Sequence, residues 1–303
     1  MSVTSEAAYA GLVCPACGAS ALQVSGQERV ACGACGEVYG AVAGVPVLVR
    51  NWQELSAELE EARRVNPLWY EAVQPPEEAS PWRHHLKKRR LYVESALARH
   101  LGAGRKAARL LDLGCGDGNH LLWLARYGEH VYGSDYNAVR LARAKALNAD
   151  ATLFVADILD YPAEDSAFDV IFFNHVIEHI PDDIAALRAI RRILRPGGLL
   201  VLGTPNEGAW WWQWAYRRDA AAIMSTDHCH FYTGQTIGLK MIKAGFKVLD
   251  THHLGWGPPD WALDGRIRKY KMVDDLFSLA GRALLPRQAS SLYLLATKEG
   301  VSA

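Results

Sequence analysis

Three side chains that could bind a metal or transfer a proton lie close together in the segment "FFNHVIEHIPDD". His175, Glu178 and His179 follow the pattern His-x-x-Glu-His, in which metalloproteases use two histidines as zinc ligands and the glutamate as base. That chemistry needs both histidines on one helix, whereas the apolar run before His175 predicts a strand that ends at a turn. The pattern therefore disfavours a protease. A divalent cation held by these three residues and proton transfer by a histidine both stay open.

Four of the six cysteines form two further clusters with metal-binding spacing. They are Cys14 with Cys17, and Cys32 with Cys35, and each pair precedes a glycine that can take the positive φ of a zinc knuckle. The segment between the pairs predicts a hairpin. A redox dithiol is the alternative, but two knuckles in series favour one closed, structural zinc site.

A glycine-rich turn in "RLLDLGCGDGNHLLWLARYG" joins a predicted strand to a predicted helix. Its third glycine comes one residue too early for a dinucleotide fingerprint. Such a turn lets a ligand lie against the backbone and the positive end of the helix. Asp135 ends the next strand, where a carboxylate can accept both ribose hydroxyls of an adenosine, and Asp157 and Ile158 end the third strand beside the expected adenine edge.

The elements that must position these residues alternate as short apolar strands and helices from residue 106 onward, which predicts a doubly wound α/β sheet. The segments "AGFKVLDTHH" and "SLYLLATKE" predict the sixth and seventh strands, the last antiparallel and at the edge. We predict a zinc ribbon over residues 1–50, a helical linker or cap over 51–105 and a large domain over 106–303. Two inserts, at about 206–232 and 253–289, would form a lid.

This ordered set of motifs resembles class I S-adenosylmethionine-dependent methyltransferases over residues 82–299, and it includes "DLGCGDG", "VADI" and "LRPGGLLVLGTPN". The resemblance implies a Rossmann-like seven-stranded sheet and S-adenosylmethionine as cofactor. The glycine loop would hold the methionine part, Asn174 would lie under the transferred methyl, and an arginine of "RRLYVE" would reach the cofactor carboxylate. The cofactor-binding residues implied are Arg90, Asp112, Gly114, Gly116, Gly118, Asp135, Tyr136, Asp157, Ile158 and Asn174.

The resemblance extends to the turn after the fourth strand and to the N-terminus. Ubiquinone-biosynthesis O-methyltransferases carry Glu-x-x-Glu-His at this turn, linked to a divalent ion, and here His175 replaces the first glutamate, which puts the ion in doubt. The segment "DHCHFYTGQTIGLKMIKAGF" is similar to a family segment whose histidine matches His228. The cysteine knuckles resemble zinc ribbons appended to methyltransferases, including activators of the Trm112 type.

Methyl transfer to oxygen needs a positioned acceptor and a base, so His179 and His228 are the candidate catalytic residues. Each could instead only shape the acceptor pocket. The tryptophan-rich segment "NEGAWWWQWAYRRD" cannot bury every ring on one helix face, so some rings should line a pocket or meet a partner. Such rings suit an aromatic, glycosyl or lipid-linked acceptor, as in secondary metabolism.

The composition limits the classes of partner that the chain could bind. The 33 basic and 33 acidic residues balance, which weakens a polyanionic partner without excluding nucleic acid. The basic run "RHHLKKRR" could touch RNA or form a solvated helix face. No membrane-spanning run or secretory leader is visible, which predicts a cytoplasmic protein. An rRNA or tRNA methyltransferase and a non-catalytic partner-binding protein are the alternatives to a small-molecule methyltransferase, and the sequence leaves the oligomeric state open.

Overall fold

The computed structural model describes residues 9–25, 29–65, 67, 71–148, 150–219 and 227–299, so part of the first predicted insert (220–226) lies outside the described residues. The chain divides into two compact units. Unit 1 comprises Met1–Gln74, Lys106–Phe172 and Ala189–Gly198. Unit 2 comprises Pro75–Arg105, Phe173–Arg188 and Leu199–Ala303.

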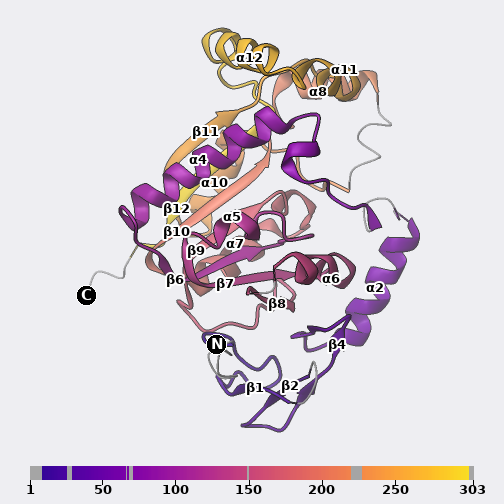
Figure 1. Cartoon of the computed structure of the whole chain (residues 1–303), viewed down its shortest axis with the longest axis vertical. Coiled ribbons are helices and arrows are strands. Elements are labelled where there is room, and N and C mark those ends of the chain that lie inside the picture. The colour runs from indigo at the N-terminus through magenta and orange to yellow at the C-terminus, as the bar shows by residue number, and fades with distance from the viewer. Residues whose placement is uncertain are drawn as a thin grey trace. The chain divides into compact units, whose positions relative to one another are not determined.

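A seven-stranded sheet in the order β11-β12-β10-β9-β6-β7-β8 confirms the predicted fold class (Figure 1). Its parallel part includes β6, β7 and β8, and β12 pairs antiparallel with both β10 and β11. The strands are β6 (Ala107–Leu113), β7 (Gly128–Asp135), β8 (Thr152–Val155), β9 (Phe168–Asn174), β10 (Leu194–Pro205), β11 (Lys247–Leu254) and β12 (Ser291–Thr297).

The prediction that the last strand lies at the edge is wrong, because β12 lies between β10 and β11. Six of the seven β12 residues are buried, as expected of a strand covered on both faces. Strand β11 is the edge strand, and its polar sequence KVLDTHHL is largely exposed or half-buried. The run of polar residues Asp250–His253 in β11 is typical of an edge strand.

The N-terminal module of unit 1 holds a three-stranded antiparallel sheet and a short hairpin. The sheet comprises β1 (Leu22–Val24), β2 (Val30–Cys32) and β3 (Val38–Tyr39), and the hairpin comprises β4 (Ala41–Val42) and β5 (Val45–Pro46). The chain then continues onto the edge of the large sheet, where Val47 forms a parallel bridge with Val155 and the Leu48 N–H donates to the Val155 carbonyl at 2.9 Å.

Apolar packing joins this module to the cofactor-loop region of unit 1. Val45 and Val47 share one core cluster with Cys115, Leu141 and Val155, all of them buried. Helix α2 (Trp52–Val65) follows, and its Trp52 packs on the same cluster. The predicted ribbon is therefore built into unit 1 rather than attached by a free linker.

Two helices flank the ligand-facing loops of unit 1: α5 (Leu121–Leu124) and α6 (Ala138–Leu147). The helix expected after the glycine loop is only four residues long, so it cannot supply the helix dipole that the sequence suggested. Helix α7 (Asp183–Ile193) continues from the segment after β9.

The helices of unit 2 are η1 (Glu77–Ala79), α4 (Arg83–Leu101), η2 (Ile177–His179), α8 (Trp210–Arg218), α10 (Gly234–Lys243), α11 (Trp261–Arg268) and α12 (Lys271–Leu284). Helix α4 lies beside β11 (Figure 1). Its basic run is only partly solvated, because the Lys88 ammonium binds Asp274 and Asp275 and the Arg83 guanidinium donates to the Lys269 carbonyl. These internal contacts occupy charges that RNA would need.

Candidate functional site

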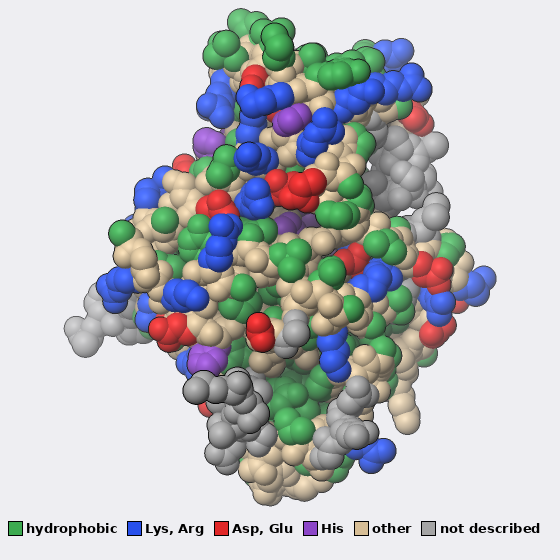
Figure 2. Space-filling view, in the orientation of Figure 1, with side chains coloured by type: hydrophobic (Ala, Val, Ile, Leu, Met, Phe, Trp, Pro, Cys, Tyr) green, Lys and Arg blue, Asp and Glu red, His purple; other side chains and the backbone are tan. Residues whose placement is uncertain are grey.

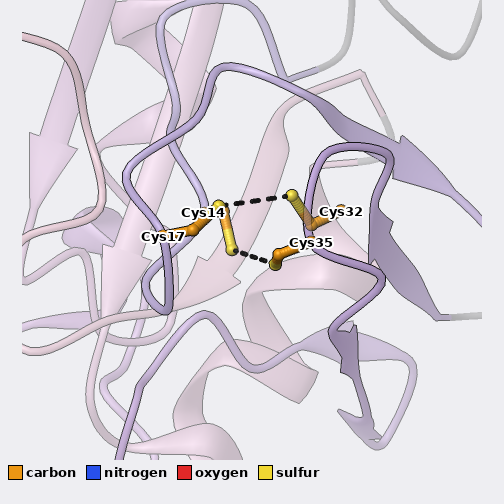
Figure 3. A group of neighbouring side chains, drawn as sticks. All are labelled: Cys14, Cys17, Cys32 and Cys35. Atoms are coloured by element: carbon orange, nitrogen blue, oxygen red, sulfur yellow. Dashed lines mark hydrogen bonds between the residues drawn. The ribbon is translucent and has the colours of Figure 1, made fainter.

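The four predicted zinc ligands come together at the tips of two knuckles (Figure 3). The Sγ atoms of Cys14 and Cys35, and those of Cys17 and Cys32, are each 3.7 Å apart. A tetrahedral site with zinc–sulfur bonds of 2.3 Å has sulfur–sulfur edges of about 3.8 Å, so the four thiols fit zinc. All four are free of disulfides. A zinc ion held by four sulfur ligands would have no open position, which is typical of a structural site.

The Tyr39 hydroxyl supports this cluster from within the ribbon. Its oxygen lies 3.0 Å from Cys14 Sγ and accepts a hydrogen bond from the Ala16 N–H. Burial opposes ionisation of Cys14, but hydrogen bonding, led by Tyr39, outweighs it and lowers the pKa of Cys14 to about 6. A thiolate is the form that binds a metal.

The glycine loop after β6 makes the tight turn that the sequence predicted. Gly114, Gly116 and Gly118 all have positive φ. A side chain at Gly118 would also place its Cβ 2.6 Å from Asn148 Nδ2, so only glycine fits there. The Gly116 N–H donates to Asp135 Oδ2 at 2.9 Å. The loop is thereby tied to the end of β7, and the Arg140 guanidinium lies against Gly116.

Two buried carboxylates at this loop test whether S-adenosylmethionine fits. Asp112 is almost fully buried, and its Oδ2 has no hydrogen-bond partner among the described residues. Burial, and then the charge of Asp135, raises the pKa of Asp112 well above its usual range. A cationic group beside Asp112 would relieve this cost, and the cofactor carries an ammonium and a sulfonium. Asp112 Oδ2 thus lacks a cationic partner of the kind that the ammonium or sulfonium of S-adenosylmethionine would provide.

Asp135 ends β7, and each of its oxygens already accepts one backbone N–H, from Gly116 and Asn137. Burial raises the pKa of Asp135, and the backbone hydrogen bonds and Arg140 partly offset this. A carboxylate oxygen can accept more than one hydrogen bond, so Asp135 can still receive ribose hydroxyls. Tyr136 follows it directly at the start of the turn to α6.

Asp157 and Ile158 follow β8, at the third strand end named by the sequence. Asp157 lines a cavity of ≈ 220 Å³ together with residues of the segment that leads into α2. The other wall residues include Val49, Arg50, Glu54, Glu58 and Asp160. No local sequence pattern indicates that the N-terminal module contributes to a cavity at this strand end.

In unit 2, Asn174 ends β9 within a network of partly buried polar groups. Tyr293 of β12 donates its hydroxyl to Asn174 Oδ1 at 2.8 Å, and accepts from Arg89 Nε at 3.0 Å. Gly203 of β10 leaves room for the asparagine, since a Cβ there would lie 2.2 Å from Asn174 Oδ1. The neighbouring residue on α4, Arg90, instead faces Glu77, with 3.4 Å between Arg90 Nη2 and Glu77 Oε1.

The turn after Asn174 keeps His175 in contact with Glu178 but leaves it outside the group of possible metal ligands. His175 has a φ of 56°, which is unusual for a residue with a side chain, and its imidazole contacts Arg89. Its Nδ1 is 3.3 Å from Glu178 Oε1. Burial, then the charge of Arg89, lowers the pKa of His175 despite the glutamate. Glu178 and His179 follow in the 3₁₀ turn η2, which excludes the protease geometry.

Glu178, His179 and His228 form the second group of possible metal ligands, with their ligand atoms all within 4.8 Å of one another. In this set His228 takes the place expected for His175. Glu178 is buried and accepts from Thr204 Oγ1 at 3.0 Å. Burial raises the pKa of Glu178, but the contacts with His175 and the charge of His179 outweigh it and the net pKa is lowered. Glu178 is therefore held as an anion.

Both histidines carry a carboxylate partner at Nδ1. Asp227 lies 2.9 Å from His179, and Glu207 lies 2.6 Å from His228. The two imidazole rings meet edge to face with centroids 4.7 Å apart. Glu207 is buried after β10, and its other oxygen accepts the Tyr216 hydroxyl. Sequence reasoning missed Glu207 and Asp227, although an acid directly after a strand end, as in "TPNEG", was an available signal.

The tryptophan-rich segment divides between core and surface on α8. Trp212 and Tyr216 are buried and pack with Ala209 and Phe231. Trp210 and Trp214 are exposed, and the Arg218 guanidinium stacks over the Trp214 ring. Part of the aromatic segment thus has a structural role, as expected, and part is free to contact another molecule.

The sheet order, the glycine loop and the acidic strand ends define a Rossmann-like domain of the class I S-adenosylmethionine-dependent methyltransferase type. Residues 82–251 match the family described as methyltransferase domain, which is more than half of the chain, and the chain belongs to that family.

Curated relatives of the chain include ubiquinone biosynthesis O-methyltransferases. A ubiquinone biosynthesis O-methyltransferase of Cereibacter sphaeroides is 32% identical over 171 residues, covering 51% of this chain and 66% of that protein. One of Xanthomonas oryzae pv. oryzae is 33% identical over 156 residues, covering 50% and 62%. The chain thus spans just under two thirds of the length of these relatives.

Among solved structures, the chain is similar to one from the complex between the Haloferax volcanii Trm112 methyltransferase activator and a methyltransferase. The TM-score is 0.51 and the identity 18%, covering 76% of this chain and 100% of that chain. At this level of identity the likeness shows the fold alone.

Proposed function

We propose that the protein transfers a methyl group from S-adenosylmethionine to a hydroxyl oxygen of a small-molecule acceptor, with His228 as the general base. The observation that carries this proposal is the pairing of His228 with Glu207, at 2.6 Å between Nδ1 and Oε2. The two curated relatives named above are O-methyltransferases, which supports the choice of oxygen.

Methyl transfer requires two contributions from the chain's own residues. When bound, the cofactor supplies an electrophilic methyl group, and its sulfur–carbon bond breaks as an oxygen–carbon bond forms. The protein must orient the acceptor and accept the hydroxyl proton. With Nδ1 held by Glu207, His228 offers Nε2 as the proton acceptor, and Glu207 stabilises the imidazolium that results.

The surroundings of His228 tune its basicity. Burial lowers the pKa of His228, but the Glu207 hydrogen bond and charge, together with the charges of Glu178 and Asp227, outweigh burial and raise it. A raised pKa makes the neutral imidazole a stronger base, but it also keeps the ring protonated up to a higher pH. Activity should therefore rise with pH on the alkaline side of the usual imidazole pKa range.

A divalent cation at Glu178, His179 and His228 is the second candidate for this cluster. The specific observation that favours it is the carboxylate at Nδ1 of each histidine, because metal-binding histidines commonly donate their other ring N–H to such a group. A cation there would orient or activate the acceptor hydroxyl instead of leaving deprotonation to His228. Chelation distinguishes the two: it should leave activity intact under the base proposal.

For the acceptor, we propose an aromatic, glycosylated or lipid-linked hydroxyl compound. Exposed Trp210 and Trp214 support an apolar, ring-bearing ligand. The relatives' names favour a quinone-type acceptor over the secondary metabolism that the sequence suggested. Six free thiols go with a reducing, cytoplasmic setting. An RNA acceptor has less support, since basic residues of α4 are engaged within unit 2.

The test is methyl transfer from S-adenosylmethionine labelled in its methyl group to a panel of catechols and phenols, with product identified by mass spectrometry. Label on oxygen, lost in the His228→Ala variant and kept after chelator treatment, is the expected result. Label found only on RNA or only on amine acceptors in a parallel panel would contradict the proposal.

A further inference from the structure

Helix α12 has its polarity inverted. The residues that face the protein are Asp274, Ser278 and Gly281, all buried. The residues that face solvent are apolar: Met272, Leu276, Leu279 and Leu284 are each between 65% and 85% exposed. Three of them recur at the i, i+4, i+7 spacing of one helix face. A surface helix ordinarily buries such a face, so this face is available to another apolar phase.

The inward polar face is fixed by specific contacts within unit 2. Asp274 is fully buried and binds Arg268 Nη2 at 2.8 Å and Lys88 Nζ at 2.6 Å. Ser278 Oγ accepts from the same ammonium at 2.9 Å. Gly281 packs so closely against Trp256 that a Cβ would lie 2.0 Å from the indole. Rotating the helix to bury its leucines would strand a buried charge, so the apolar face stays outward.

Basic side chains surround this face. Within residues 260–288, as the structure describes them, the acidic residues with an accessible carboxylate are Asp260, at the N-cap of α11, and Asp275, whose side chain is 42% accessible. Asp264 and Asp274 are buried against Arg268, and Asp275 pairs with Lys88 and Lys271. The exposed basic residues are Arg266, Lys269, Lys271, Arg282 and Arg287. Figure 2 shows hydrophobic side chains over α12 with Lys and Arg side chains below them.

We infer that α12 docks the protein onto an anionic lipid bilayer, with Met272, Leu276 and Leu279 inserted at the level of the headgroups. An exposed apolar stripe beside basic side chains is the pattern of helices that lie in the plane of a membrane surface. Lysine and arginine near such a surface add attraction to anionic lipids. A second copy of the chain fits less well, because a symmetric pairing of this face would bring two basic rims together.

Docking at a surface agrees with the lengths of the helices. Among the described residues, no helix combines the length and apolar character needed to cross a bilayer. Helix α12 has 14 residues, about 21 Å at 1.5 Å per residue, which is shorter than a bilayer core. The inference concerns a surface contact and does not depend on the proposed methyl transfer.

The experiment is flotation of the full zinc-loaded chain with two kinds of vesicle, pure phosphatidylcholine and equal parts of phosphatidylcholine and phosphatidylglycerol. We expect co-flotation with the anionic vesicles, little with the neutral ones, and loss of binding as salt is raised. Absence of co-flotation with the anionic vesicles at low salt would overturn the inference.

A matched pair of double variants distinguishes vesicle binding through α12 from nonspecific binding through other exposed apolar side chains. The variant Leu276→Ser/Leu279→Ser should lower the partition coefficient on anionic vesicles at least about tenfold, with unchanged thermal melting because both side chains are exposed. The control Leu239→Ser/Ile242→Ser removes leucine and isoleucine that are 59% and 58% exposed on α10, beside two lysines, and should bind like the parent. Equal loss in both variants, or no loss in the α12 variant, contradicts the inference. A further result would also contradict the inference: a parent chain that binds no vesicles and that light scattering shows to be a dimer, which the α12 substitutions dissociate.

Discussion

His228 and Glu207 approach within 2.6 Å, and the glutamate's second oxygen is occupied by the Tyr216 hydroxyl. Glu207 is thus fixed from two sides and holds one ring nitrogen of His228. His179 has a similar partner, Asp227, but that carboxylate is more exposed, with 36% of its side chain accessible against 5% for Glu207. The more buried pair is the better preorganised one, which favours His228 over His179 as the base.

Replacing His228 by alanine should lower kcat by roughly 10²–10⁴-fold, the usual contribution of a positioned base. The affinity for S-adenosylmethionine, measured by calorimetry, should change little, because the glycine loop, Asp112 and Asp135 lie in unit 1 and His228 lies in unit 2. His179→Ala serves as the comparison and should lose much less. A larger loss of kcat in His179→Ala than in His228→Ala would identify His179 as the general base.

The pH profile of kcat/KM should report the Glu207–His228 pair. The base acts when neutral, so activity rises as pH passes the His228 pKa, which Glu207 raises. Glu207→Gln removes the charge, lowers that pKa and should move the acidic limb to lower pH while reducing the maximal rate. Asp227→Asn is the control. Because Asp227 raises the pKa of His228 less than Glu207 does, the acidic limb of this variant should move less. An acidic limb that stays in place in Glu207→Gln speaks against His228 as the titrating base.

Most of the large fold was predictable because its signals are local. Apolar runs and turn glycines fixed six strands in order, and Asp112 and Asp135 followed from their places at strand ends. The position of β12 was not predictable in the same way. Its pairing with both β10 and β11 joins segments that are distant in the chain, and only the continuous burial of its residues distinguishes an inner strand from an edge strand.

The second cluster was predicted only in part, for a similar reason. His175, Glu178 and His179 are neighbours in sequence, but the positive φ of His175 turns its imidazole toward Arg89. His228, from about fifty residues further along, joins Glu178 and His179 as a possible metal ligand, while His175 Nδ1 remains 3.3 Å from Glu178 Oε1. The carboxylate partners Glu207 and Asp227 are also brought in by tertiary structure, which no local spacing encodes.

Cys32→Ser should abolish zinc binding and also weaken binding of S-adenosylmethionine several-fold. The ribbon shares the core of Val47, Leu141 and Val155 with the cofactor region, and the segment after it lines the cavity at Asp157. Elemental analysis should give close to one zinc per parent chain. Cys229→Ser, which changes a thiol outside the cluster, should keep the metal. A zinc-free variant with unchanged cofactor affinity would show that the ribbon acts separately.

Tyr293→Phe should destabilise the protein by about 1–3 kcal/mol, because Asn174 Oδ1 and Arg89 Nε both lose a buried partner. Chemical denaturation measures the change. Tyr92→Phe removes a hydroxyl that bonds exposed Asp250, and should cost less than about 0.5 kcal/mol. Equal effects of the two substitutions would mean that the network around Asn174 is not a stabilising one.

Binding of S-adenosylmethionine to the purified chain, freed of carried-over cofactor, is the most direct test of the account. Calorimetry should show one site per chain. Asp135→Asn should weaken it at least tenfold, about 1.4 kcal/mol, because the ribose hydroxyls lose a charged acceptor. Asp160→Asn, a change at an exposed carboxylate on the cavity rim, should have a smaller effect. A folded, zinc-loaded parent chain that gives no binding heat at several temperatures would contradict the assignment as an S-adenosylmethionine-dependent methyltransferase.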